Sequence, residues 1–172
     1  MSKVKTILKI AAPMLVIAII TGMFIYKSET KKKSENTDLQ YPLEITEINI
    51  DDLRSHGMPL ILDFGSDTCP PCREMHPVLV TLNEEFQGKA LLHYINLSYP
   101  VEGASQFPLQ YTPTQFFFNA DGTPFVPSKE LSEALYFNYY SDKESGSLVY
   151  TAHIGALSES ELRAILSEMG VE

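Results

Sequence analysis

The sequence contains no tryptophan and only two cysteines, Cys69 and Cys72, with two prolines between them. A pair this close forms a very short ring, so it removes little loop-closure entropy from the unfolded chain and is a poor structural staple. Two cysteines also fall short of the four ligands that a structural zinc site takes. The spacing therefore favours reversible redox chemistry, or a metal site completed by other side chains.

Basic side chains are scarce after residue 38. Residues 39–172 contain six Lys and Arg against nineteen Asp and Glu, a net charge of −13, whereas the whole chain carries −9. A domain this acidic repels phosphate groups and has no counterions to release from them. We therefore expect no nucleic-acid partner.

Charge is absent from the run Ile10–Tyr26, which follows a short start carrying Lys3, Lys5 and Lys9. The run reaches the lower limit of about 17–25 residues for a bilayer-spanning helix, and the two apolar residues before Lys9 lengthen it. No small-x-small cleavage site follows it, and no cysteine is available for a lipid anchor. Residues 1–26 are therefore predicted to be an uncleaved signal anchor, with a cleaved secretory signal as the alternative.

Basic residues flank the run on both sides, so the positive-inside count leaves the orientation open. The short basic start is typical of an export signal. It predicts a single-pass protein of the cell membrane whose C-terminal domain lies outside the cytoplasm. Residues 27–38 are polar and poor in apolar side chains, which predicts a flexible tether to a domain formed by residues 39–172.

Within this domain, short apolar runs alternate with helical patterns. This order predicts an α/β sandwich around a mixed sheet. Residues 114–126 are predicted to form a hairpin around Asp121-Gly122, and residues 127–147 form an insertion before the last strand. Strands are expected at 58–64, 89–98 and 147–155, and helices at 45–57, 72–86 and 158–170, the last with a Ser158–Glu161 capping box.

Cys69 ends the loop after the first predicted strand and stands at the start of the next helix. Free backbone N–H groups and the helix dipole stabilise a thiolate there, and such placement lowers a cysteine pKa from about 8.5 to about 3.5–7.5. Cys69 is therefore the predicted nucleophile, and Cys72, one turn further, is predicted to resolve the mixed disulfide. Pro71 fixes φ at the helix start without loss of a hydrogen bond.

Four segments resemble the thioredoxin family in order and spacing. "LILDFGSDTCPPC" matches its strand, loop and redox motif, and Pro77, five residues after Cys72, matches its kink-forming proline. "YTPTQFFF" matches the segment that holds the family's cis-proline, and "HIGALSESEL" matches its last strand and helix. From about Leu43 to Val171 the chain therefore resembles a thioredoxin-like three-layer α/β/α sandwich with a mixed sheet.

The resemblance implies roles for individual residues. Cys69 and Cys72 would form the redox disulfide, and buried Asp63 would accept a proton from Cys72. Pro113 would be the cis-proline, whose geometry leaves the backbone of Thr112 free to pair with an extended substrate. The remaining residues implied beside the substrate are Thr68, Pro70, Pro71 and Gly155.

Two departures separate this chain from a general thioredoxin. Thr68 stands where the family usually carries tryptophan, and Pro70 stands where it carries glycine. Together with the predicted anchor, they make the chain resemble the thiol reductases of the cell envelope, which act on protein disulfides and dithiols. Such proteins draw electrons through a membrane donor of the CcdA/DsbD kind, and the resemblance implies no cofactor and no metal.

Two alternatives stay open. An oxidase or an isomerase can share this motif, because reduction potentials of such proteins span about −270 to −120 mV. A copper-binding module on the same fold would use the two thiolates with a histidine, and His76 lies four residues after Cys72 on the same helix. The other candidate histidines are His56, His93 and His153. The insertion is expected to lie far from the cysteines, as added packing that extends the sheet or as a docking surface.

Overall fold

The computed structural model describes residues 40–172, which fall within one compact unit, Leu39–Glu172. The predicted signal anchor, residues 1–26, and the predicted tether, residues 27–38, lie outside the described residues and stay predictions. Within residues 40–172, no helix combines the length and the apolar character needed to cross a bilayer.

The described chain forms a five-stranded mixed sheet with strand order β2-β1-β3-β5-β4. Strands β1 and β2 are parallel, and the other neighbours are antiparallel, which confirms the predicted mixed sheet. In chain order the elements are α2 (Ile50–Ser55), β1 (Leu60–Gly65), α3 (Pro70–Glu85), β2 (Leu91–Asn96), the 3-10 turn η1 (Ala104–Gln106), β3 (Thr114–Phe118), α4 (Lys129–Leu135), β4 (Asn138–Ser141), β5 (Leu148–Ile154) and α5 (Glu159–Glu168).

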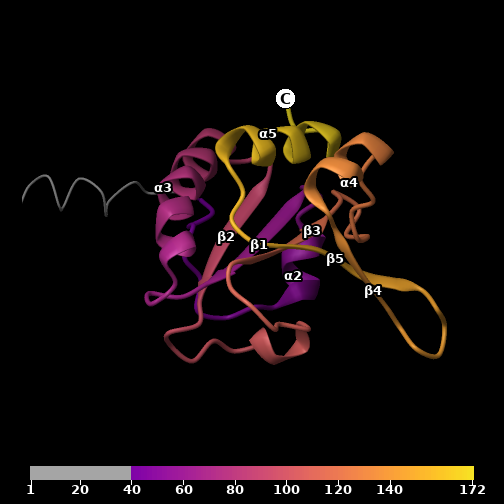
Figure 1. Ribbon diagram of the computed structural model, residues 1–172, viewed down its shortest axis with the longest axis horizontal. Helices are drawn as coiled ribbons and strands as arrows, with labels where there is room; N and C mark the ends of the chain where they lie inside the picture. The colour runs from indigo at the N-terminus through magenta and orange to yellow at the C-terminus, as the bar shows by residue number, and fades with distance from the viewer. Residues whose placement is uncertain (1–39) are drawn as a thin grey trace, which may run out of the picture. The chain divides into compact units, whose positions relative to one another are not determined.

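The sheet is buried on both faces because helices cover each of them. Figure 1 shows α3, α5 and α4 in succession along one side of the sheet. Side chains of α3 and α5 pack there on Ile61 and Phe117, while α2 and η1 pack with Leu62 and Phe116 on the opposite face. Every residue of β1 is buried, as expected for a strand between two helical layers. The predicted α/β architecture around a mixed sheet is therefore confirmed.

The predicted helix boundaries at the cysteines and at the C-terminus agree with the structure. Cys69 caps α3, whose first two positions are prolines, and Pro77 lies inside the helix. The predicted capping box of α5 is present, with Ser158 and Glu161 each bonded to the other's backbone. These local signals fixed where both helices begin, because capping satisfies N–H groups that the helix itself leaves free.

Two predicted elements were wrong in extent. The first helix is only α2, because Ile48 is buried in an extended segment and Asn49 caps the helix after it. The second arm of the predicted hairpin does not form a strand: its turn is present, and a short bridge between Phe118 and Pro124 is flanked by two backbone hydrogen bonds, Asn119 N–H to Thr123 O and Phe125 N–H to Phe117 O. The pairing of this arm goes no further, because β3 already lies between β1 and β5 in the sheet.

The insertion, residues 127–147, contributes α4 and β4, and β4 extends the sheet beside β5. Its expected position was wrong in part. Thr114 starts β3 opposite Ile154 at the end of β5, and Asn138 starts β4 opposite Ala152. Because antiparallel neighbours reverse direction, the junction of α4 and β4 returns to the end of the sheet that carries the cysteines, offset by three strand spacings, about 14 Å.

Candidate active site

Cys69 and Cys72 form a disulfide at the N-terminus of α3, with their Cα atoms 5.3 Å apart. Cys69 retains 9% of its exposed area, whereas Cys72 retains 1%. Of the two cysteines, Cys69 is therefore the one that a partner protein can reach. This asymmetry supports the predicted division between an attacking and a resolving cysteine.

Backbone N–H groups around the sulfur of Cys69 are few. The Cys72 N–H donates to Cys69 Sγ at 3.2 Å, which makes Cys69 the side-chain cap of α3. A helix cap accepts a hydrogen bond from the N–H of the second or the third helical position. Pro71 occupies the second position and has no N–H, so one backbone donor remains for a thiolate at Cys69.

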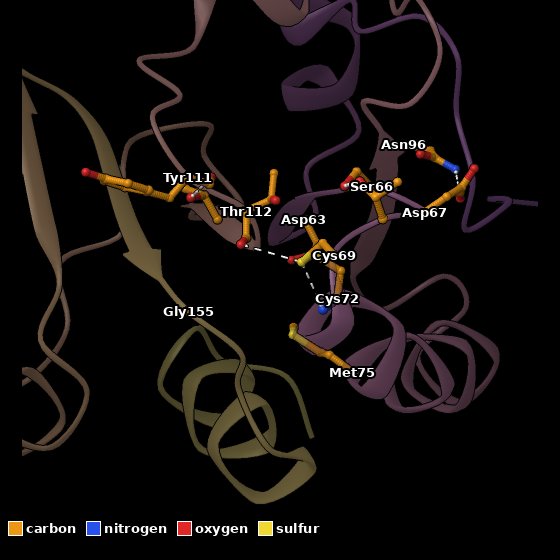
Figure 2. The surroundings of a disulfide bond; sticks show 12 residues. Asp63, Ser66, Asp67, Cys69, Cys72, Met75, Asn96, Tyr111, Thr112 and Gly155 are labelled. Atoms are coloured by element: carbon orange, nitrogen blue, oxygen red, sulfur yellow. Dashed lines mark hydrogen bonds between the residues drawn. A yellow bond between two sulfur atoms is a disulfide. The ribbon is translucent and has the colours of Figure 1, made fainter.

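The loop before β3 lies against the disulfide. The Thr112–Pro113 peptide bond is cis, and the carbonyl oxygen of Thr112 lies 3.5 Å from Cys69 Sγ. Pro113 is buried, and its carbonyl accepts a hydrogen bond from the Gly155 N–H at 2.9 Å. The structure therefore brings Thr112, Pro113 and Gly155 together near Cys69, and Figure 2 shows the Thr112 carbonyl directed at Cys69.

The loop from β1 to α3 is held by polar contacts. The Asp67 N–H donates to Ser98 Oγ at 2.8 Å. Asn96 Nδ2 donates to Asp67 Oδ1 at 2.8 Å, as Figure 2 shows. Thr68 is exposed next to Cys69, and both Pro70 and Pro71 are exposed at the start of α3. These three predicted substrate-binding residues therefore form the open rim of the disulfide.

Asp63 is buried, at 1% exposure, on the face of β1 that α3 covers. Gln115 Nε2 donates to Asp63 Oδ1 at 2.6 Å, while Asp63 Oδ2 has no hydrogen-bond partner. Burial raises the pKa of Asp63 from 3.8 to about 7, and the bond from Gln115 lowers it by a smaller amount. A carboxyl with this pKa can gain or lose a proton near neutral pH.

Two residues near the disulfide were missed in the sequence. Gln115 touches Asp63, and its signal was present: it is a lone amide inside the apolar strand "TQFFF". Tyr111 is 66% exposed and borders a hollow of about 500 Å³, lined also by Leu97, Leu109, Gln110 and Thr112. Its ring points away from the disulfide in Figure 2, and no periodic pattern marks it.

The four histidines are engaged elsewhere. His76 contacts Glu44 at 3.4 Å and packs edge-on against Tyr94. Ring nitrogens of His93 and His153 lie at hydrogen-bond distance from backbone carbonyls, and His56 packs against Tyr41. Within residues 40–172, no group of three or more His, Cys, Asp or Glu side chains is placed to hold a metal ion.

Known proteins resemble this chain in sequence. Residues 47–137 match the sequence profile of the thioredoxin-like domain. The chain belongs to the thioredoxin-like family. It is 30% identical over 99 residues to a thioredoxin of Staphylococcus saprophyticus, covering 54% of this chain and 93% of that protein. It is 31% identical over 70 residues to thioredoxin 1 of Chlorobaculum tepidum, covering 40% and 69%.

Solved structures agree on the fold of this thioredoxin-like chain. The Fasciola hepatica thioredoxin aligns with a TM-score of 0.51 and 18% identity, covering 74% of this chain and 99% of that one. A mutant thioredoxin from Halobacterium salinarum aligns with a TM-score of 0.52 and 22% identity, covering 78% and 96%. The chain is therefore a thioredoxin-like thiol–disulfide oxidoreductase whose redox-active C-x-x-C is Cys69 and Cys72.

Proposed function

We propose that this oxidoreductase works as a reductase of protein disulfides outside the cytoplasm, held at the membrane by its N-terminal segment. The observation that carries the direction is the single backbone N–H that reaches Cys69 Sγ. A strongly stabilised reduced form makes a thiol–disulfide protein an oxidant. Because Pro71 offers no second N–H, the thiolate of Cys69 is stabilised less, and the dithiol gives up its electrons more readily.

The reaction has two exchange steps. The thiolate of Cys69 attacks one sulfur of a client disulfide, the client's sulfur–sulfur bond breaks, and the departing client thiolate takes up a proton. Cys72 then attacks the sulfur of Cys69, which releases the second client thiolate and forms the Cys69–Cys72 disulfide. Two electrons pass from the dithiol to the client.

Asp63 is the proposed base of the second step. Cys72 is buried, so its thiol has no water to take its proton. The carboxylate of Asp63, with a pKa of about 7, accepts that proton as Cys72 attacks. Thr112 holds the client: its carbonyl faces Cys69, so its backbone can pair with an extended client strand next to the reacting sulfur.

The oxidised protein needs a dithiol donor to work again. We assign this role to a membrane protein of the CcdA/DsbD kind, because the apolar run Ile10–Tyr26 would keep the domain beside it. The donor's dithiol would reduce the Cys69–Cys72 bond by the same two steps in reverse. Residues 39–172 carry a net charge of −13, which repels phosphate groups, so we expect no nucleic acid to bind this domain.

The direction is tested by equilibrating the full chain with glutathione and measuring the reduction potential. A reductase gives a value near −270 mV, and a value near −120 mV would reassign the protein as an oxidase. Pro71→Ala adds the missing N–H, and we expect it to make the potential less negative by about 30 mV. Thr68→Ala is the matched control, because it changes the rim without adding a backbone donor.

The location is tested on cells that express the full chain. In cells whose envelope outside the cytoplasmic membrane has been made permeable, added protease is expected to cut the domain. In a separate fractionation, the membrane pellet is expected to retain the chain after alkaline washing. Deleting residues 2–26 is expected to move the domain into the soluble cytoplasmic fraction. Protection of the domain from protease in the intact full chain would contradict an extracytoplasmic location.

A further inference from the structure

Four polar side chains form one row across the middle of the sheet. Asp63 of β1 is the register partner of Tyr94 in β2 and of Gln115 in β3, and Gln115 is the partner of His153 in β5. Partners in adjacent strands project to the same face. The row therefore crosses the face that α3 and α5 cover, where the surrounding core is apolar.

Gln115 is fully buried at the centre of this row. Its Nε2 donates to Asp63 Oδ1 at 2.6 Å and to the Gly155 carbonyl at 3.2 Å, and it lies 3.7 Å from Met75 Sδ. All three neighbours are acceptors, so the amide nitrogen, not the oxygen, must occupy this position. Both amide hydrogens thus fix the side chain between β1 and the segment before α5.

Two buried atoms of the pair have no hydrogen-bond partner: Asp63 Oδ2 and Gln115 Oε1. Both are acceptors while the carboxyl is ionised, so they cannot satisfy one another. A proton on Oδ2 turns that atom into a donor. An amide and a carboxyl each carry two polar atoms on one planar carbon, so the protonated pair can form two parallel bonds.

We propose that Gln115 is the positioning residue for the resolving step, which it serves by holding the Asp63 carboxyl through Nε2 in both protonation states and accepting from Oδ2–H once the proton has arrived. This inference rests on the proposed role of Asp63 as the base for Cys72. Met75 lies one turn after Cys72 on α3 and touches the same amide nitrogen, so the pair lies beneath the reacting turn.

Other titratable groups face the pair from each neighbouring element. Tyr94 on β2 stays neutral in the working range, because burial raises its pKa to about 12. On α3, Cys72 lies one turn before Met75, which contacts Gln115 Nε2. On β5, His153 lies within hydrogen-bond distance of the Leu135 carbonyl, with Glu161 of α5 beyond it, and burial lowers the pKa of His153. Gln115 is the residue that bonds directly to the carboxyl.

The test measures the resolving step in the full chain. Reduced protein is mixed rapidly with dithiobis(nitrobenzoate), and the second release of nitrothiobenzoate reports the attack of Cys72 on Cys69. Gln115→Met keeps the length and removes the donor. Because a hydrogen bond to a carboxylate stabilises its charged form, we expect the pH midpoint of the second phase to rise by about one unit or more.

At pH near 6.5 this shift slows the second phase of the Gln115→Met variant about tenfold. Above pH 9 the Asp63 carboxyl is ionised in both the original protein and the variant, so their rates converge. A purely structural role would lower the rate equally at every pH. Phe117→Leu is the control: it weakens the same face of the same strand without touching Asp63, so it is expected to lower the unfolding free energy and leave the midpoint unchanged.

Asp63→Asn separates the two hypotheses. If it slows the second phase and Gln115→Met then adds nothing in that background, Gln115 acts through Asp63, as proposed. If Asp63→Asn is slow while Gln115→Met keeps the original midpoint, the role of Gln115 is overturned and that of Asp63 stands. If Asp63→Asn leaves the second phase unchanged, Asp63 is not the base, and both assignments fall.

Discussion

Two regions lie at the same end of the sheet: the turn that carries Cys69, and the junction of α4 and β4 in the inserted segment, residues 127–147. They are held in place by different kinds of contact. The turn is held by polar contacts: Asp67 to Ser98 and Asn96, and the Cys72 N–H to the sulfur. The insertion is held by apolar packing, with Leu131 and Leu135 buried and Phe137 against Phe117 and Phe125. Its outward aromatic residues, Tyr136 and Tyr139, are exposed.

This difference separates chemistry from support. Polar contacts at the turn orient groups that exchange electrons and protons, while burying a side chain in the insertion adds stability without touching the sulfur. Substitutions at the turn are therefore expected to change rates, and substitutions in the insertion to change the unfolding free energy. The predictions below test this division, from the largest expected effect to the smallest.

Replacing Cys69 is expected to have the largest effect. Cys69→Ser removes the more exposed of the two cysteines, so disulfide exchange with a protein client is expected to stop entirely. Cys72→Ser keeps the attack but removes the resolving step, so mixed disulfides with clients accumulate and are visible on non-reducing gels. Trapping by the Cys69 variant and none by the Cys72 variant would reverse the two roles.

Asp63→Asn is expected to slow the second exchange step about 100-fold near pH 7, the lower range for loss of a general base. The first step, attack by Cys69, is expected to change little, because Asp63 is bonded to Gln115 and not to that sulfur. Rapid-mixing measurements with a disulfide reagent resolve the two phases. Equal slowing of both would place Asp63 in a structural role.

Asp63→Asn slows the second exchange step but is expected to increase the stability of the folded protein. The pKa of Asp63 is about 7 in the folded protein against 3.8 in the unfolded chain, so between these values folding takes up a proton. The unfolding free energy therefore falls as pH rises through this window and is lowest above pH 7. Asp63→Asn is expected to restore up to about 4 kcal/mol there and nothing near pH 3, measured by urea unfolding.

Leu135→Ala tests the inserted segment. Leu135 is buried at the end of α4, so its truncation is expected to cost about 2–4 kcal/mol of unfolding free energy. The rates of both exchange steps are expected to stay within about twofold of the original. Ser132→Ala, on the same helix but partly exposed, is the matched control for the substitution itself. A large loss of rate in a folded Leu135 variant would show that the insertion supports the site.

Most of the fold could be predicted because its signals are local. Capping residues and apolar periodicity marked α3 and α5, and the C-x-x-C after a buried strand marked the redox site. β4 was missed because its sequence, Asn138–Ser141, is an exposed edge that carries no alternation of buried and exposed residues. The hairpin was over-extended because a correct turn signal at Asp121-Gly122 says nothing about which strand β3 finally pairs with.

The site was predictable where spacing and helix position indicate chemistry, as with Cys69 and Cys72, and where the family resemblance supplied the role, as with Asp63. Gln115 acquires its role only from register: β3 places it opposite Asp63, 52 positions away in the chain. A single sequence gives the polarity of that position but not its partner. Long-range pairing of this kind depends on the whole sheet, which local patterns do not encode.

Tyr136→Gly is expected to have the smallest effect of these substitutions. Tyr136 ends α4 with φ at 51°, a left-handed conformation that glycine adopts freely, and its side chain is 80% exposed. We therefore expect a gain of about 0.5–1 kcal/mol in unfolding free energy and unchanged exchange with a small disulfide reagent. Comparing that reagent with a protein client completes the test. If the variant gains stability and reduces the protein client more slowly, but not the small reagent, then the insertion contacts clients. The separation between a turn that sets rates and an insertion that sets stability would then not hold at Tyr136.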